Sequence, residues 1–303
     1  MRANPAEPIR IVYFGTPSYA VPALEALLAD SRASLVLVVT QPDRPAGRGR
    51  KLTPPPIKAI GLDHGVQVYQ PESLRTEVDR EPIAAAKADL FVVAAFGKIF
   101  GPKLLALPRL GAVNLHASLL PDYRGASPIS AAIFDGQNET GITLMRMDTG
   151  LDTGPILSQR PLAIHSESTT ASLTPQLAQL GADLLIESLD GLIARSLAPV
   201  PQDDRAATLT RPLVKADGWI DWTMPAIEIE RQIRAMWDWP RGWTTLRGDQ
   251  VQIHRATVDP TPAASPPGTI DAWNGVPVVA TGAGGLIVDV AQSAGSKPLP
   301  GSV

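Results

Sequence analysis

The chain has 303 residues, of which 44% are hydrophobic and 19% charged, and its formal net charge at pH 7 is −3. This length allows a large buried core and two domains. The small negative charge argues against a protein that is basic over its whole surface, so any contact with nucleic acid should be local. The sequence has no cysteine, which excludes disulfides, thiolate metal sites and a cysteine nucleophile. No apolar run approaches the roughly 20 residues that cross a bilayer, and the first residues lack the apolar core of a signal peptide, so we expect a cytoplasmic protein without membrane contact.

Strand and helix patterns alternate through the first third of the chain. Strands are predicted at Ile11–Phe14, Leu35–Thr40, Val66–Tyr69 and Leu90–Ala95, and helices at Ser18–Leu28 (with Ser18 as cap), Ile57–His64 and Val78–Ala86. Continuous apolar strands separated by helices are typical of a parallel sheet covered on both faces. The sequence therefore predicts an α/β domain with a doubly wound, mostly parallel sheet.

A basic insertion, residues 41–58, interrupts this alternation. It carries its positive charges among prolines and glycines, at Arg44, Arg48, Arg50, Lys51 and Lys58. Basic residues on a flexible loop can neutralise phosphates and give affinity without reading a base sequence. A merely solvated loop is the more frequent interpretation of such a run by itself.

Two stretches occupy the edge of the predicted sheet where α/β proteins bind ligands. Phe96–Ile99 directly follows a strand, and its backbone groups could hold a flat ligand. The next predicted strand, Ala112–Leu115, leads into two polar side chains at period two, Asn114 and His116. Residues two apart in a strand point to the same face, so these side chains should lie side by side at the mouth of the loop 117–125.

A carboxylate loop, Asp148–Gly154, follows a helical turn at Ser127–Pro128 and a strand near Thr143–Met145. If this strand neighbours the one that ends at His116, their carboxyl ends should meet, and Asp148 or Asp152 would face the imidazole.

The three side chains of this trio together can perform a definite kind of chemistry. An imidazole exchanges protons near neutral pH, a carboxylate beside it favours its charged form, and Asn114 can donate to an oxygen that becomes negative. Such a set suits acyl-type transfer with a nucleophile brought by the substrate, because the chain has neither a cysteine nor a Gly-x-Ser-x-Gly motif. A lone histidine at a strand end is nevertheless more often a structural group.

The remaining chain predicts a second domain. A strand at Ile156–Pro161 and a long helix at Ser168–Ile193 precede a linker, Ala198–Leu209, and a helix capped by Thr223. Short strands follow at Thr244–Leu246, Val251–Thr257, Gly268–Ala272, Val276–Ala280 and Leu286–Ala291. Strands of this length and spacing are typical of a small OB-like β-barrel.

Tryptophans concentrate in this second part, at Trp219, Trp222, Trp237, Trp239 and Trp243. With nearby arginines they could stack against RNA bases. Tryptophan in a small barrel is more often part of the core.

Several separated motifs occur together and in order. They are Phe14–Pro17, Gln41–Gly49, Asn114–His116, Ser118–Pro121, Arg124–Gly125, Leu151–Pro155 and Asp217–Trp222. In these motifs the chain resembles the formyltransferases that use 10-formyltetrahydrofolate, and most closely those that act on methionyl-tRNA. The resemblance runs from about Arg10 into the 290s.

The resemblance implies a fold and a reaction. It implies a Rossmann-like formyltransferase domain at residues 1–197, a linker at 198–209 and an OB-like tRNA-binding domain at 210–303. The implied reaction transfers the formyl group of 10-formyltetrahydrofolate to the α-amino group of methionyl initiator tRNA, giving N-formylmethionyl-tRNA for translation initiation. The implied partners are this tRNA and folate, with no metal, and we expect a monomer.

Other functions stay open at this point. The same core could formylate an amino-sugar nucleotide or a purine-pathway amine, or hydrolyse the formyl folate, and the basic insertion and second domain argue against the last two. An RNA-binding module on a degenerate catalytic fold is a further alternative. The presence of all three side chains of the trio argues against it, because a binding module does not need them.

Site residues follow from the matching motifs. The implied catalytic residues are Asn114, His116 and Asp152, with Asp148 as the alternative partner of the imidazole. The implied folate contacts are Phe96, Gly97, Ile99, Ser118, Leu119, Leu120 and Pro121. The implied tRNA contacts are Arg44, Arg48, Arg50 and Lys51, of which Arg48 is expected to matter most.

Overall fold

The computed structural model describes residues 7–46, 49, 51–261, 265–273 and 276–301. The chain divides into two compact units, the first formed by residues 1–125, 141–162 and 175–209 and the second by 126–140, 163–174 and 210–303. Residues 126–140 and 163–174, expected in the first domain, belong to the second unit.

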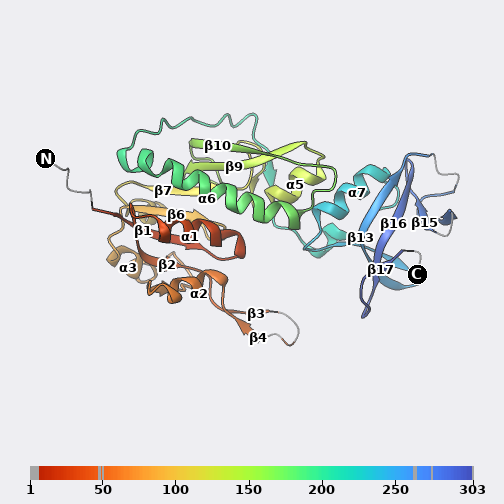
Figure 1. Cartoon of the computed structure of the whole chain (residues 1–303), viewed down its shortest axis with the longest axis horizontal. Helices are drawn as coiled ribbons and strands as arrows, with labels where there is room; N and C mark the ends of the chain where they lie inside the picture. Colours follow the sequence, from red (N-terminus) through yellow and green to blue (C-terminus); the bar gives the residue numbers. More distant parts are fainter. Residues whose placement is uncertain (1–6, 47–48, 50, 262–264, 274–275, 302–303) are drawn as a thin grey trace. The chain divides into compact units, whose positions relative to one another are not determined.

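The first unit is built on a seven-stranded sheet in the order β10-β9-β7-β6-β1-β2-β5 (Figure 1). Its strands are β1 (Ile9–Gly15), β2 (Ala33–Val39), β5 (Val68–Tyr69), β6 (Leu90–Ala94), β7 (Ala112–His116), β9 (Glu139–Arg146) and β10 (Ile156–Ala163). The strands β5, β2, β1, β6 and β7 pair in parallel. The helices are α1 (Val21–Ala29), α2 (Pro56–Asp63), α3 (Glu77–Ala85), α4 (Pro102–Leu105) and α6 (Thr170–Ala194). The predicted doubly wound, mostly parallel α/β fold is confirmed.

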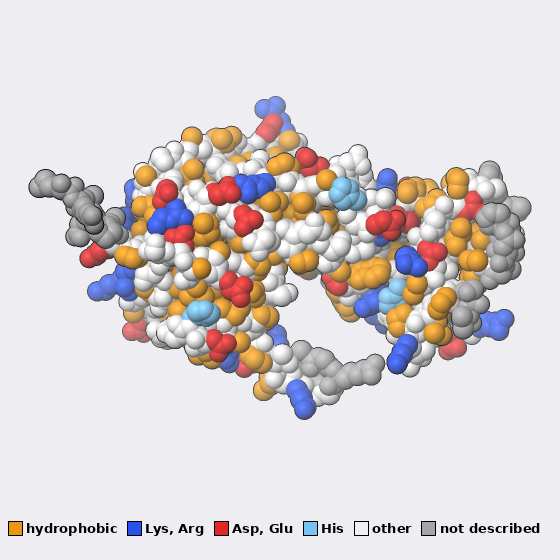
Figure 2. All heavy atoms as spheres, viewed as in Figure 1, with side chains coloured by type: hydrophobic (Ala, Val, Ile, Leu, Met, Phe, Trp, Pro, Cys, Tyr) orange, Lys and Arg blue, Asp and Glu red, His pale blue; other side chains and the backbone are white. Residues whose placement is uncertain are grey.

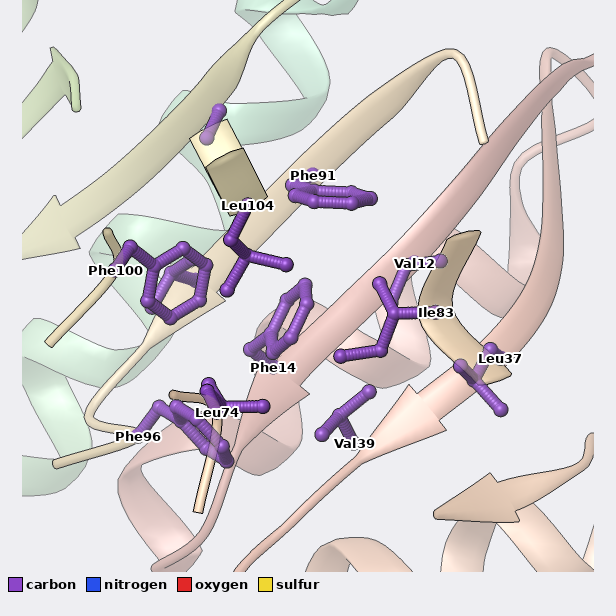
Figure 3. Packing of buried hydrophobic residues seen from close by; sticks show 12 residues of the cluster. Val12, Phe14, Leu37, Val39, Leu74, Ile83, Phe91, Phe96, Phe100 and Leu104 are labelled. Atoms are coloured by element: carbon purple, nitrogen blue, oxygen red, sulfur yellow. The ribbon is translucent and has the colours of Figure 1, made fainter. Parts of the chain in front are cut away.

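Alternate residues of the central strands build a core on one face of this sheet, which α3 and α4 cover (Figure 3). Phe14 of β1 lies at its centre and makes edge-to-face contacts with Phe91, Phe96 and Phe100, at centroid distances of 5.1, 5.4 and 4.8 Å. Burying one such ring stabilises the fold by roughly 1.5–3 kcal/mol, and each edge-to-face pair adds about 0.5–1.5 kcal/mol. The ring of Phe96 thereby anchors the loop after β6 to the core.

The strand β9 lies beside β7 but runs antiparallel to it. His116 is paired with Thr143 and Val113 with Arg146. The expectation that the carboxyl ends of these two strands meet is wrong, because Thr143 in the middle of β9 lies beside His116, whereas Arg146, its last residue, lies beside Val113 near the start of β7. The carboxylate loop reaches the imidazole because the chain beyond β9 turns back toward the carboxyl end of β7, where Asp152 lies 3.6 Å from His116.

Two predicted helix caps are also wrong. Ser18 begins a 3-10 turn, Ser18–Ala20 (η1), and α1 starts after it without a side-chain cap. In the second unit α7 (Ala226–Ala235) begins after Pro225, while the Thr223 hydroxyl donates to Asp221. Proline fixes φ near the helical value, so Pro225 starts the helix without a hydroxyl cap.

The segment predicted as a linker follows the surface of the first unit. Val200 forms a bridge with Ile156, and the Arg124 N–H donates to the Thr208 carbonyl at 2.9 Å. A short strand at its end, β11 (Leu209–Thr210), pairs with β8 (Arg124–Gly125). The segment is therefore bound to the loop that follows His116.

The second unit is a curled antiparallel sheet in the order β12-β13-β16-β15-β14, with β17 on β16. Its elements are η2 (Lys215–Gly218), α7, β12 (Gly242–Leu246), β13 (Asp249–Asp259), β14 (Ile270–Trp273), β15 (Val276–Ala280), β16 (Gly285–Ser293) and β17 (Leu299–Pro300). Register shifts around Arg255 bend β13 against β16. The curled sheet and α7 enclose a core that includes Ile229, Ile253 and Leu286, consistent with the predicted OB-like fold. The helix α5 (Pro128–Phe134) packs against α7.

Candidate active site

His116, at the end of β7, is held by a backbone carbonyl. Its side chain is 6% exposed, and its Nε2 lies 2.9 Å from the carbonyl oxygen of Tyr123. A carbonyl can only accept, so Nε2 carries the proton. The other nitrogen, Nδ1, lies 3.6 Å from the Asp152 carboxylate and makes no hydrogen bond to it.

Asp152 completes the predicted trio. Its Oδ2 accepts from the Gly125 N–H at 2.9 Å and lies 3.6 Å from His116 Nδ1. Its Oδ1 lies 3.5 Å from the Asn114 amide nitrogen, which donates to it. The structure thus brings Asn114, His116 and Asp152 together, as the motifs imply.

The backbone of Asp152 is in the left-handed region, at φ 52°. For a residue with a side chain this conformation costs roughly 1–3 kcal/mol and persists only where surrounding contacts impose it. The strain coincides with the one carboxylate that faces the imidazole.

Asp148, the alternative partner, is engaged elsewhere. Its Oδ1 accepts from the Gly150 N–H at 3.0 Å and from the Thr153 hydroxyl at 2.7 Å. Asp148 is exposed and closes the turn of its own loop. The geometry favours Asp152 as the partner of His116.

The trio is arranged for transfer of a carbonyl group. The Asn114 amide has two N–H groups, of which the long contact to Asp152 uses one. The Nδ1 of His116 lies beyond hydrogen-bonding distance of the carboxylate, so in the protonated ring its N–H can donate to a third atom placed between them. Two donors and one carboxylate acceptor can stabilise an oxygen that becomes negative and take up a proton released beside it.

The loop Phe96–Ile99 offers backbone groups and an apolar side chain. Gly97 has φ 78°, and the Phe96 carbonyl accepts from the Gln41 amide at 2.9 Å. Ile99 is 84% exposed. The ring of Phe96 points into the core (Figure 3), so this residue can contribute only its backbone. This loop can therefore contact a ligand through its backbone groups and the Ile99 side chain.

Two of the four side chains of the motif Ser118–Pro121 are buried. Ser118 is fully buried, and its hydroxyl donates to the Asp122 carbonyl at 2.5 Å. The Leu120 side chain is buried, its N–H donates to Thr143, and its carbonyl accepts from Gln159. Leu119 and Pro121 are partly exposed. Among the predicted folate contacts of this motif, Ser118 and Leu120 therefore shape the loop instead of presenting side chains.

The basic insertion forms a hairpin where a flexible loop was expected. Its strands are β3 (Arg44–Ala46) and β4 (Lys51–Thr53), paired antiparallel. Arg44 and Lys51 are exposed, and the predicted contacts Arg48 and Arg50 lie outside the described residues. Lys58 is 2.8 Å from Asp43, and hydrogen bonds from Gln70 and Lys58 hold the pKa of Asp43 below its usual range. Lys58 thus neutralises a carboxylate at the base of the hairpin.

Two of the tryptophans singled out in the sequence, Trp219 and Trp239, are exposed and not part of the core of the second unit. Trp239 is 57% and Trp219 43% exposed. Trp219 packs edge-to-face on Trp243 at 4.9 Å, and Lys215 lies 5.5 Å from the Trp243 ring. Trp222, which is partly buried, packs against the core of the unit.

Sequence reasoning missed three contributors to the site. Tyr123 and Gly125 act through backbone atoms, for which residue type carries no signal. Gln202, within the predicted linker, donates to the carbonyls of Asp152 and Gly154 at 2.8 and 2.6 Å. No local pattern connects a glutamine to a loop 50 residues away.

Metal clusters and membrane spans are both absent from the described residues. Over these residues, no group of three or more His, Cys, Asp or Glu is placed to hold a metal ion. No helix in the described part of the chain is long and apolar enough to cross a membrane.

Solved structures share this fold at low sequence identity. An N-formyltransferase from Helicobacter canadensis, solved with folinic acid and dTDP-3-aminofucose, matches with a TM-score of 0.70 and 19% identity over 94% of this chain and 99% of its own. HypX from Aquifex aeolicus, solved with tetrahydrofolic acid, matches with a TM-score of 0.61 and 15% identity over 98% of this chain and 46% of its own.

Sequence comparisons are more specific. Residues 9–189 match the formyl transferase family and residues 212–303 the formyl transferase C-terminal domain. The methionyl-tRNA formyltransferase of Roseiflexus sp. (strain RS-1) is 48% identical over 97% of this chain and 90% of its own length. The corresponding protein of Stutzerimonas stutzeri (strain A1501) is 46% identical over 97% of this chain and 93% of its own length. The chain belongs to the methionyl-tRNA formyltransferase family.

Proposed function

We propose that Asn114, His116 and Asp152 form the centre at which this formyltransferase moves the formyl group of 10-formyltetrahydrofolate to the amine of methionyl initiator tRNA. The observation that carries the proposal is the convergence of the three side chains, with His116 Nδ1 3.6 Å and Asn114 3.5 Å from the Asp152 carboxylate. The strained backbone of Asp152 supports it, because such strain clusters at active sites.

In this mechanism Asn114 and His116 stabilise negative charge. The uncharged amine of the methionyl group attacks the formyl carbon, and electrons move onto the formyl oxygen. The Asn114 amide and the Nδ1–H of protonated His116 donate to that oxygen as its charge grows, so they bind the transition state more strongly than the ground state. The new C–N bond is complete when the bond from the formyl carbon to the folate nitrogen breaks.

Asp152 contributes its negative charge and accepts a proton. Its negative charge lies 3.6 Å from Nδ1 and offsets the positive charge of the protonated ring in the transition state. It also accepts, directly or through a water molecule, the proton that the attacking amine loses. The proton that Asp152 takes from the amine passes to the departing folate nitrogen, so the reaction neither gains nor releases a proton overall.

Binding of the two substrates is assigned to separate parts of the chain. The loop Phe96–Ile99 would hold the pterin ring through backbone groups and the exposed Ile99 side chain. The exposed Arg44 and Lys51 of the β3–β4 hairpin would neutralise tRNA phosphates, and Arg48 and Arg50 remain predicted contacts. The amino-sugar nucleotide alternative rests on neighbours with 18–19% identity, against 43–48% for relatives named for methionyl-tRNA.

Paired substitutions test the role of Asp152. Asp152→Asn should lower single-turnover formyl transfer by about a hundredfold or more, since it removes both the proton acceptor and the charge that supports His116. Asp148→Asn, the matched control in the same loop, should lose far less. A larger loss for Asp148→Asn would contradict the assignment.

A further inference from the structure

We propose that Gln202 is a positioning residue: its side-chain amide holds the backbone of Asp152 in the conformation that turns the carboxylate toward His116. The inference rests on the proposed function of Asp152. Gln202 hydrogen-bonds to the backbone of the loop and to Arg124, so its role in the reaction is exerted through the loop that carries Asp152.

The amide of Gln202 is fixed by three hydrogen bonds. Its Nε2 donates to the carbonyls of Asp152 at 2.8 Å and Gly154 at 2.6 Å. Its Oε1 accepts from the Nε of Arg124 at 2.9 Å. The opposite orientation would set Oε1 against two carbonyl oxygens and an NH₂ group against an N–H donor, so only one orientation satisfies the neighbours.

The loop that carries Asp152 needs such support. Asp152 has φ 52°, and a Cβ added at Gly154 would lie 1.8 Å from the Arg146 carbonyl oxygen. His116 Nδ1, at 3.6 Å, is too distant from the carboxylate to hold it by a hydrogen bond. The position of the carboxylate therefore depends on the Gly125 N–H, which donates to it at 2.9 Å, and on the backbone of its own loop. A displacement of about 1 Å at such a site can lower a rate roughly a hundredfold.

Arg124 extends the support to the loop beside His116. Its side chain is 6% exposed and donates to Gln202 and, at 2.8 Å, to Asp204. Its backbone continues from Tyr123, whose carbonyl accepts from His116. Gln202 thus links the loop that orients the imidazole to the loop that presents the carboxylate. It fixes the position of these two groups relative to each other.

The pH dependence of a conservative variant gives the first test. In Gln202→Glu the new carboxylate still accepts from Arg124 but repels the carbonyls of Asp152 and Gly154. At pH 8 we expect formyl transfer at saturating substrates to fall about tenfold or more. The ratio of wild-type to variant rates should shrink as the pH falls, because a protonated carboxyl can donate again. Gln179→Glu, on the exposed face of α6, is the matched control and should show a constant ratio near one.

A double-mutant cycle gives the second test. Gln202→Leu should lower the rate at every pH in the wild-type background, with the KM for the formyl donor changed little. In the Asp152→Asn background the same substitution should add almost nothing, because its effect passes through the carboxylate that has been removed. Additive losses, or a Gln202→Glu variant that matches the wild type at every pH, would overturn the inference. If Asp152→Asn itself keeps full activity, the proposed function fails instead.

Discussion

At the scale of the residue, the chemistry of the site depends on which polar atom of each side chain already makes a hydrogen bond within the protein. The period-two spacing of Asn114 and His116 was enough to predict that the pair lies together. It contained no information on the Tyr123 carbonyl, which occupies Nε2 and leaves Nδ1 as the reactive nitrogen. Asp152 was identified from its motif, but its left-handed backbone and its bond to the Gly125 N–H could not be predicted, since both arise from packing around the loop.

Gly154 should be indispensable for a steric reason. In Gly154→Ala the added Cβ would lie 1.8 Å from the Arg146 carbonyl oxygen, so the loop that carries Asp152 must move. We expect formyl transfer to fall about a hundredfold, measured in single turnovers. Gly101→Ala, where a Cβ meets nothing within 4 Å, is the control. Full activity of Gly154→Ala would show that the loop tolerates displacement.

His254 of β13 should make the second unit sensitive to mild acid. Burial, and secondarily the charge of Arg241, lowers the pKa of His254, while Gln292 accepts from its Nε2. A folded-state pKa below the unfolded value means that the unfolded chain binds the proton more readily. This contribution to stability is therefore complete above the unfolded pKa of about 6.5 and is lost as the pH falls through the folded value.

Thermal unfolding between about pH 7.5 and 5.5, a range that brackets the unfolded pKa, measures this effect. His254→Gln should show a smaller fall of the unfolding temperature over that range than the wild type, whereas His165→Gln, which replaces an exposed histidine, should follow the wild type. Equal falls for His254→Gln and the wild type would contradict the prediction.

At the scale of the element, most of the first unit could be predicted from hydrophobic patterns. The five parallel strands and the helices α1, α2 and α3 were found within a few residues, because continuous apolar runs identify buried strands. The short helix α4 was not predicted. The direction of β9 could not be found in this way, since the same apolar pattern fits either direction. The basic insertion was predicted as a loop because prolines and glycines obscure the short strands β3 and β4.

The β3–β4 hairpin should contribute affinity for tRNA without affecting the chemistry. Replacing Arg44 and Lys51 by alanine should weaken binding of methionyl-tRNA and reduce the slope of log K against log salt by about one for each phosphate that is no longer neutralised. The KM for the formyl donor should stay unchanged. Arg75→Ala, an exposed arginine of the same unit, is the control. An unchanged salt slope in the double variant would place the tRNA elsewhere.

At the scale of the whole molecule, composition predicted two domains and a local nucleic-acid contact. On the face shown in Figure 2, acidic and basic side chains are intermixed, in agreement with the net charge of −3. The sequence did not predict that residues 126–140 and 163–174 join the second unit. That assignment follows from the packing of α5 against α7, two helices far apart in the chain, and no local periodicity reports such a contact.

The central claim is that the trio at the end of β7 formylates methionyl-tRNA. The most direct measurement offers 10-formyltetrahydrofolate to the protein with methionine-charged initiator tRNA and an amino-sugar nucleotide in competition, alongside a His116→Ala variant. We predict transfer to the tRNA alone, reduced about a hundredfold or more in the variant because one donor to the developing negative charge is removed, with binding of the formyl donor retained. Transfer to the sugar, or full activity of His116→Ala, would contradict the account.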